Sequence, residues 1–268
     1  GYLNDLWRWD GTRWTWMSGS KTIAASAVYG SKGVAADANV PGARYGAAAW
    51  TAGSGNLWRF GGNGYTATSS GRLNDLWRWD GARWTWMAGS SAPNRLGTYG
   101  QMGVPSTSNS PGGRMLMSAW KDADGAFWLF GGDGFPAAGA SGYLSDLWRW
   151  DGAGETWTWV AGSDETGLTG TYGILGAPNA ANAPGSRASG AAWVDASGDL
   201  LQFGGQGNGD VAGVGELDDV WSRGLSCRSL AAISAAGAVC ASSTGNGAFV
   251  SDAGAGATYS WSVSGGTI

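Results

Sequence analysis

Arginine residues at a recurring position are the side chains best suited to bind a ligand. Each one opens a run predicted to form a strand, and a Tyr-Gly pair precedes each of them; the arginines are Arg44, Arg114 and Arg187, and the tyrosines are Tyr29, Tyr99 and Tyr172. A guanidinium group presents a planar fork of donors that matches a carboxylate or another anion. If the repeated units surround a central channel, three such groups at its mouth would form an anion site. Alternatively, each arginine hydrogen-bonds carbonyl groups of a neighbouring repeat and holds a loop in place, and the tyrosines anchor the same loops.

Catalytic and metal chemistry find little support in the composition. The 268 residues include no histidine, which removes Ser-His-Asp and Cys-His triads, histidine general bases and histidine-ligated zinc or copper. No pair of acidic residues stands apart from the repeat pattern described below. We therefore expect a protein that is not an enzyme, with no catalytic residues, no metal ligands and no cofactor.

The charge balance limits the partners. The net charge is −4 and the isoelectric point is near 4.7, whereas nucleic-acid binding requires a basic surface. No apolar run approaches the roughly 20 residues that cross a bilayer. The sequence predicts neither nucleic-acid binding nor a membrane span.

An internal repeat of about 70 residues dominates the chain. The stretch Leu3-Asn-Asp-Leu-Trp-Arg-Trp-Asp10 recurs at Leu73–Asp80 and Leu144–Asp151, and in weaker form at Leu217–Trp221. One aspartate recurs within it, which we expect to accept backbone N–H groups: Asp5, Asp75, Asp146 and Asp219. Such a period predicts copies of one supersecondary unit.

Each copy contains four runs typical of strands, bounded by turn residues. In residues 44–88 these runs are Arg44–Trp50, Leu57–Gly62, Asp75–Trp79 and Arg83–Met87. Tryptophans within a run lie two residues apart, so they share one face of a strand. Burial between neighbouring sheets explains this pattern better than an exposed platform for sugar rings. The sequence predicts an all-β fold.

The order of motifs resembles kelch repeats, particularly those of large bacterial secreted proteins. It is carried by Phe60-Gly-Gly62, Phe130-Gly-Gly132 and Phe203-Gly-Gly205, each followed by the Asp-Leu/Val-Trp run. The resemblance implies a kelch-type β-propeller over residues 1–225, with a half blade at 1–18 and blades at 44–88, 114–161 and 187–222. These three and a half blades fall short of the usual four to eight, so upstream blades or strands of another chain would complete the ring. Galactose oxidase, a copper enzyme, shares this type of propeller, but its histidine ligands have no counterpart here.

Composition changes after residue 225. Residues 226–268 resemble the beginning of an Ig-like domain of the polycystic-kidney-disease type. They contain both cysteines of the chain, Cys227 and Cys240. Two cysteines that close a short loop favour a disulfide and an extracellular or cell-surface location, the alternative being a pair of buried free thiols.

The predicted loops suggest where a partner binds. Turns that join the first and second or the third and fourth strands are short, whereas the remaining connections are long, so we expect the long loops to gather on one face. We interpret the chain as a non-catalytic interaction module of a larger secreted or surface protein, which binds a protein segment or a glycan through this face. The alternative is a structural unit of an extracellular filament or surface layer, assembled as a homo-oligomer or completed by strands of neighbouring chains.

Overall fold

The computed structural model describes residues 1–225, which are all-β, as the sequence predicts. They form 18 strands in antiparallel sheets, and no helix occurs among them. It follows that this part of the chain has no helix with the length and apolarity needed to cross a membrane. The predicted Ig-like segment and the predicted Cys227–Cys240 disulfide lie outside the described residues.

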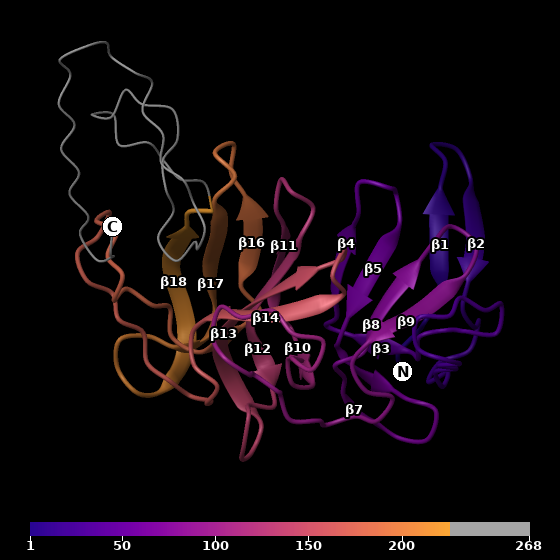
Figure 1. Ribbon diagram of the computed structural model, residues 1–268, viewed down its shortest axis with the longest axis horizontal. Coiled ribbons are helices and arrows are strands. Elements are labelled where there is room, and N and C mark those ends of the chain that lie inside the picture. The colour runs from indigo at the N-terminus through magenta and orange to yellow at the C-terminus, as the bar shows by residue number, and fades with distance from the viewer. Residues whose placement is uncertain (226–268) are drawn as a thin grey trace, which may run out of the picture.

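The sheets follow the repeat. Figure 1 shows them side by side in chain order, from β1 and β2 at one end to β18 at the other. We call residues 1–18 the N-terminal hairpin, which contains β1 (Leu6–Trp9) and β2 (Trp14–Ser18). The first unit (44–88) contains β3 (Arg44–Tyr45), β4 (Ala48–Thr51), β5 (Leu57–Phe60), β6 (Asn63–Tyr65), β7 (Ser70–Arg72), β8 (Leu76–Trp79) and β9 (Trp84–Ala88).

The other two units repeat this plan with longer strands. The second unit (114–161) contains β10 (Arg114–Met115), β11 (Ser118–Lys121), β12 (Phe127–Gly134), β13 (Gly142–Asp151) and β14 (Thr156–Ala161). The third unit (187–223) contains β15 (Arg187–Ala188), β16 (Ala191–Val194), β17 (Leu200–Asn208) and β18 (Val214–Arg223). The strand order is β4-β5-β8-β9 in the first unit. In the second unit β10 and β11 both pair with β12, and the order continues β12-β13-β14. Among the described residues, the third unit has no strand equivalent to β9 and β14.

The diglycine after the second strand of the first and second units lies at the contact with the next unit. Gly61 and Gly62 have φ values of 66° and 93°, in the left-handed region that favours glycine. A Cβ atom on Gly61 would lie 2.8 Å from the carbonyl oxygen of Arg114. The N–H of Gly62 donates to that same oxygen at 2.8 Å. The Phe-Gly-Gly sequence therefore allows the inner strands of adjacent units to approach each other.

Indole rings fill the space between the sheets of the first and second units, as the tryptophan pattern predicts, whereas the four tryptophans of the N-terminal hairpin are half-exposed. Between the first and second units, Trp50 stacks on Phe127 at 5.0 Å, and Phe60 meets the ring of Trp157 edge-on at 5.3 Å. The core at this contact includes Leu76 and Trp148, both fully buried. Smaller cores join the hairpin to the first unit and the second unit to the third. Because apolar burial dominates folding stability, the contacts between units hold the array together.

Candidate functional site

A buried cluster of four side chains recurs in the units. In the first unit, Arg44 donates from Nη1 and Nη2 to the two carboxylate oxygens of Asp75, at 2.5 and 2.9 Å. The hydroxyl of Tyr29 and the indole N–H of Trp77 both donate to Asp75 Oδ2 at 2.8 Å. Both partners of the ion pair have fully buried side chains. The carboxylate thus collects donors from the first strand, the third strand and the preceding loop.

The cluster is complete in three units and incomplete in the hairpin. Its other members are Arg114, Asp146, Tyr99 and Trp148 in the second unit, and Arg187, Asp219, Tyr172 and Trp221 in the third. In the hairpin, the indole N–H of Trp7 donates to Asp5 at 2.7 Å, and no arginine or tyrosine of the described part of the chain joins it. Asp5 therefore occupies the aspartate position of the cluster, and Trp7 is its donor among the described residues.

All six residues predicted to bind a ligand belong to these clusters, and the arginines hydrogen-bond carbonyl groups of their own repeat, not those of a neighbouring repeat as the structural alternative expected. Arg44 Nε donates to the Gly42 carbonyl, and Nη1 also donates to the Gly61 carbonyl. The guanidinium groups of all three arginines are buried in this way, so they do not face a channel mouth. We expected the aspartates to accept hydrogen bonds from backbone N–H groups, and this was wrong. Asp75 accepts hydrogen bonds from the side chains of Arg44, Tyr29 and Trp77. We assign no ligand to these residues.

The electrostatics of the clusters follow from burial and pairing. Burial alone would raise the pKa of Asp75. The positive charge of Arg44 and its hydrogen bonds lower that pKa, and so do the hydrogen bonds from Trp77 and Tyr29, so the pKa lies below its usual value. In the third unit the same opposition lowers the pKa of Asp219 to about 2. Burial raises the pKa of Tyr29, and the nearby Asp75 carboxylate raises it further. At neutral pH the clusters of the first and third units therefore contain an ionised aspartate and a protonated tyrosine.

These pKa values predict a loss of stability in acid. Since the folded-state pKa of Asp219 is near 2 and an unfolded aspartate titrates near 3.9, the unfolded chain takes up a proton first. The contribution of Asp219 is therefore complete above about pH 4 and disappears as the pH falls towards about 2. We expect the urea midpoint to fall over this range and to fall less steeply in Asp219→Asn. An equally steep fall in the variant would show that this carboxylate does not contribute.

The long loops of the first two units do not stay at one end of the sheets, which corrects the expectation that they gather on one face. The N–H of Gly33 donates to the carbonyl of Trp86, and that of Gly103 donates to the carbonyl of Trp159, both at 2.8 Å. The amide of Asn39 donates to the Trp84 carbonyl at 3.1 Å. Residues 19–43 and 89–113 therefore run along the outer edges of β9 and β14, towards the opposite end.

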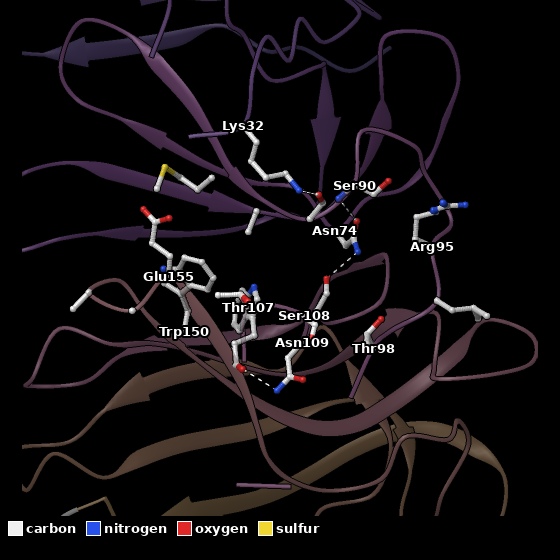
Figure 2. A pocket seen from close by; sticks show the side chains of 18 residues that line it. Lys32, Asn74, Ser90, Arg95, Thr98, Thr107, Ser108, Asn109, Trp150 and Glu155 are labelled. Carbon is white, nitrogen blue, oxygen red and sulfur yellow. Dashed lines mark hydrogen bonds between the residues drawn. The ribbon is translucent and has the colours of Figure 1, made fainter. Parts of the chain in front are cut away.

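A cleft of about 670 Å³ opens where the loop of the second unit meets the first unit. Its walls come from the end of β9, from residues 90–110 and from the turn between β13 and β14. Figure 2 shows Trp150 on one side of this cleft and the hydroxyl groups of Ser90, Thr98 and Thr107 around it. The indole N–H of Trp150 is buried and has no hydrogen-bond partner among the described residues. The cleft is thus lined by donors and acceptors with an indole beside them.

Three charged side chains at the cleft depart from the repeat. Lys32 is replaced by Met102 and Leu175 at the equivalent positions of the other loops, and Arg95 by Ala25 and Leu168. Glu155 lies in a longer turn, since five residues separate Asp151 from Trp157 but three separate Asp80 from Trp84. Figure 2 places Lys32, Arg95 and Glu155 on different sides of the cleft. Three charged residues that the repeat does not require therefore line the same cleft.

The three charges are available to a ligand. Lys32, Arg95 and Glu155 are exposed, and no ion pair joins any of them to another described residue. Lys32 donates to the Gly89 carbonyl at 2.8 Å and lies 4.5 Å from the centre of the Trp86 ring, which fixes its position. Glu155 has a φ of 51°, a strained value for a residue with a side chain. The cleft combines two cations with one carboxylate.

Sequence reasoning missed this cleft because it followed the repeated residues. The signal was present in the departures from the repeat: a cation at position 95, a cation at position 32 and the insertion that carries Glu155. The sequence could not predict that these residues lie at the same cleft, since Lys32 and Glu155 belong to different repeats. Among the described residues, no group of acidic side chains or cysteines has the arrangement of a metal site.

Comparison with known proteins found no family model that matches this chain and no match among the curated proteins.

Proposed function

We propose that residues 1–225 form blades of a kelch-type β-propeller within a larger secreted or surface protein, and that this module binds a glycan without catalysis. The propeller is supported by antiparallel sheets that follow a repeat and pack face to face through indole cores. The glycan site is the cleft between the first and second units. The observation that carries this proposal is the convergence there of Lys32, Arg95 and Glu155, which the repeat does not require.

The chemistry of the cleft favours an acidic glycan. Hydroxyl and amide side chains match sugar hydroxyls, and the exposed cations Lys32 and Arg95 suit a carboxylate such as that of a uronic acid. A peptide that extends a sheet would need a free strand edge. The outer edges of β9 and β14 already bond to loops through Gly33 and Gly103. A protein segment therefore has less opportunity here than a glycan.

A non-catalytic role agrees with the carboxylates at the cleft. Glycoside hydrolysis commonly uses two carboxyl groups, one as acid and one as base or nucleophile. Glu155 is the one acidic residue among those that line the cleft. A single carboxylate beside two cations can orient a ligand, but it does not supply this acid–base pair.

The binding proposal predicts a charge-dependent affinity. We expect Arg95→Ala and Lys32→Met each to weaken binding of a uronic-acid oligosaccharide by about 10- to 150-fold, since each removes one charge-assisted hydrogen bond worth about 1.5–3 kcal/mol. Glu155→Gln is expected to strengthen it, because a like charge is removed. Titration calorimetry with oligogalacturonate measures these changes, and added salt should weaken the wild-type complex.

Matched variants separate the cleft from a general effect of charge. Arg13→Ala and Lys121→Ala remove exposed cations that do not line the cleft, so they should leave the affinity unchanged. If the control variants weaken binding as much as Arg95→Ala does, the oligosaccharide binds through overall charge and the cleft is not the site. If an acidic peptide binds and oligogalacturonate does not, the ligand is a protein segment.

A further inference from the structure

Four half-exposed indoles cover one face of the N-terminal hairpin. Trp7 pairs with Trp16 and Trp9 with Trp14 across the two strands, so the four rings share a face. Their exposed fractions are 49%, 48%, 49% and 65% in that order. The opposite face carries Leu6 and Met17, which pack against the first unit. The indole face therefore points away from the described array.

The third unit also presents an apolar face at the other end of the array. Phe203 pairs with Val220 across β17 and β18, and Trp193 pairs with Leu201 across β16 and β17. Trp193, Phe203 and Val220 are 43%, 45% and 58% exposed. Leu200, which alternates with them along β17, packs against the second unit. Both ends thus expose apolar side chains on the face that has no neighbour among the described residues.

These two faces are the repeat equivalents of the two sides of an interface already present in the chain. Where the first unit meets the second, Phe60 and Leu76 occupy the positions of Phe203 and Val220, and both are fully buried. On the other side, Trp150 and Trp157 occupy the positions of Trp9 and Trp14, and they are 1% and 2% exposed. The face of the third unit therefore complements the indole face of the hairpin.

The internal interface shows which pairs would meet. Trp58 lies 6.4 Å from Trp150, and Phe60 lies 5.3 Å from Trp157, measured between ring centres. The equivalent pairs across the open ends are Leu201 with Trp9 and Phe203 with Trp14. Trp9 and Trp14 lie on the third and fourth strands of the repeat, which are the only ones that the hairpin contains, whereas Leu201 and Phe203 lie on the second strand of the third unit. The open ends can therefore reproduce the part of this interface in which a second strand meets a third and a fourth strand.

We propose that a second copy of this chain occupies the indole face, with the third unit of one copy packed on the N-terminal hairpin of the next. Four indoles of roughly 200 Å² each, about half exposed, leave roughly 400 Å² of contiguous apolar surface, and apolar patches of this size are often functional. Because the two faces differ, the contact is head-to-tail, so each copy has one free face of each kind. Such copies assemble into a chain or close into a ring.

Two variants of the full chain test this proposal. The first carries Trp9→Ser and Trp14→Ser, and the second carries Phe203→Ser and Val220→Ser. We expect the wild type to show a mass that rises with concentration in analytical ultracentrifugation, while each variant alone stays monomeric. An equimolar mixture of the two should form a dimer and no larger species, because one intact face of each kind remains. Met102→Ser, at an exposed apolar residue on neither face, should associate like the wild type.

Three outcomes overturn the proposal. A wild type that is monomeric at several hundred micromolar has no such contact. Association of the Phe203/Val220 variant alone would show that indole faces bind each other symmetrically. Two monomeric variants whose mixture also stays monomeric would show that the faces do not meet, provided that circular dichroism confirms that both are folded. This assembly is independent of the proposed glycan site, because Arg95→Ala leaves both faces unchanged.

Discussion

Replacing Asp146 by alanine is expected to destabilise the protein by about 3–5 kcal/mol, because it leaves a buried guanidinium group without its counter-ion. Arg114 and Asp146 are paired through two hydrogen bonds of 2.6 and 2.7 Å, and both side chains are fully buried. The hydroxyl of Tyr99 and the indole N–H of Trp148 also lose their acceptor. Urea unfolding followed by tryptophan fluorescence measures the loss.

The hairpin offers the matched control for this change. Asp5 occupies the same position in the repeat but has no arginine or tyrosine partner among the described residues, and its described donor is Trp7. Asp5→Ala is therefore expected to change the free energy of unfolding by no more than about 0.5 kcal/mol, as an ordinary surface substitution does. Equal losses in Asp5→Ala and Asp146→Ala would contradict the structural role of the arginine.

A double replacement separates pairing from packing. When both Arg114 and Asp146 are replaced by apolar residues, as in Arg114→Met with Asp146→Leu, no unpaired charge remains. Apolar replacement of a whole buried pair is often neutral or stabilising. We expect the double variant to be more stable than Asp146→Ala. A double variant that is as unstable as Asp146→Ala would show that packing around the cluster dominates.

Gly89→Ala is expected to destabilise the protein by more than about 2 kcal/mol, since it combines a strained backbone with a steric clash. Gly89 has a φ of 81°, and a Cβ atom there would lie 1.9 Å from the carbonyl oxygen of Asn74 and 2.9 Å from the Asp75 Cα atom. Both neighbouring atoms belong to the backbone beside the buried cluster, so neither moves freely. The unfolding midpoint in urea measures the effect.

Gly53→Ala is the control for this substitution. Nothing lies within 4 Å of the position of its Cβ atom, and its φ is outside the left-handed region. Alanine at such a site is neutral or stabilises slightly, because it restricts the unfolded chain. If Gly89→Ala is as stable as Gly53→Ala, the long loop adjusts at its first residue and the close approach to Asn74 is not required.

Much of the local structure was predictable because it depends on neighbouring residues. The strand at Trp84–Ala88 lies within one residue of the run Arg83–Met87 that the sequence predicts. Alternation reports which side chains share a face, so it also predicted burial of the tryptophans between sheets. The kelch resemblance, the extracellular location and the glycan ligand stay predictions.

The buried clusters were not predictable from the repeat, and the arginines show why. The sequence placed Arg44 at the start of a strand and Asp75 in the third strand. It did not predict that Arg44 Nη1 and Asp75 Oδ1 lie 2.5 Å apart. Their bond joins residues 31 positions apart. Pairing across a sheet depends on register and on the loop that brings Tyr29 to the same carboxylate, which no short pattern encodes.

The amino-acid sequence by itself therefore determined the all-β fold, the repeat, the strand positions and the alternation of buried indoles, because each follows from local spacing. Only the tertiary structure decided that the recurring arginines are neutralised inside each unit, and that Lys32, Arg95 and Glu155 meet at one cleft. The physical reason is that ion pairing depends on distances between strands of one unit that are far apart in sequence, whereas cleft formation depends on distances between separate units. Those distances arise when the strands pair and the sheets pack against one another, and they set which charges are buried and which stay available to a partner.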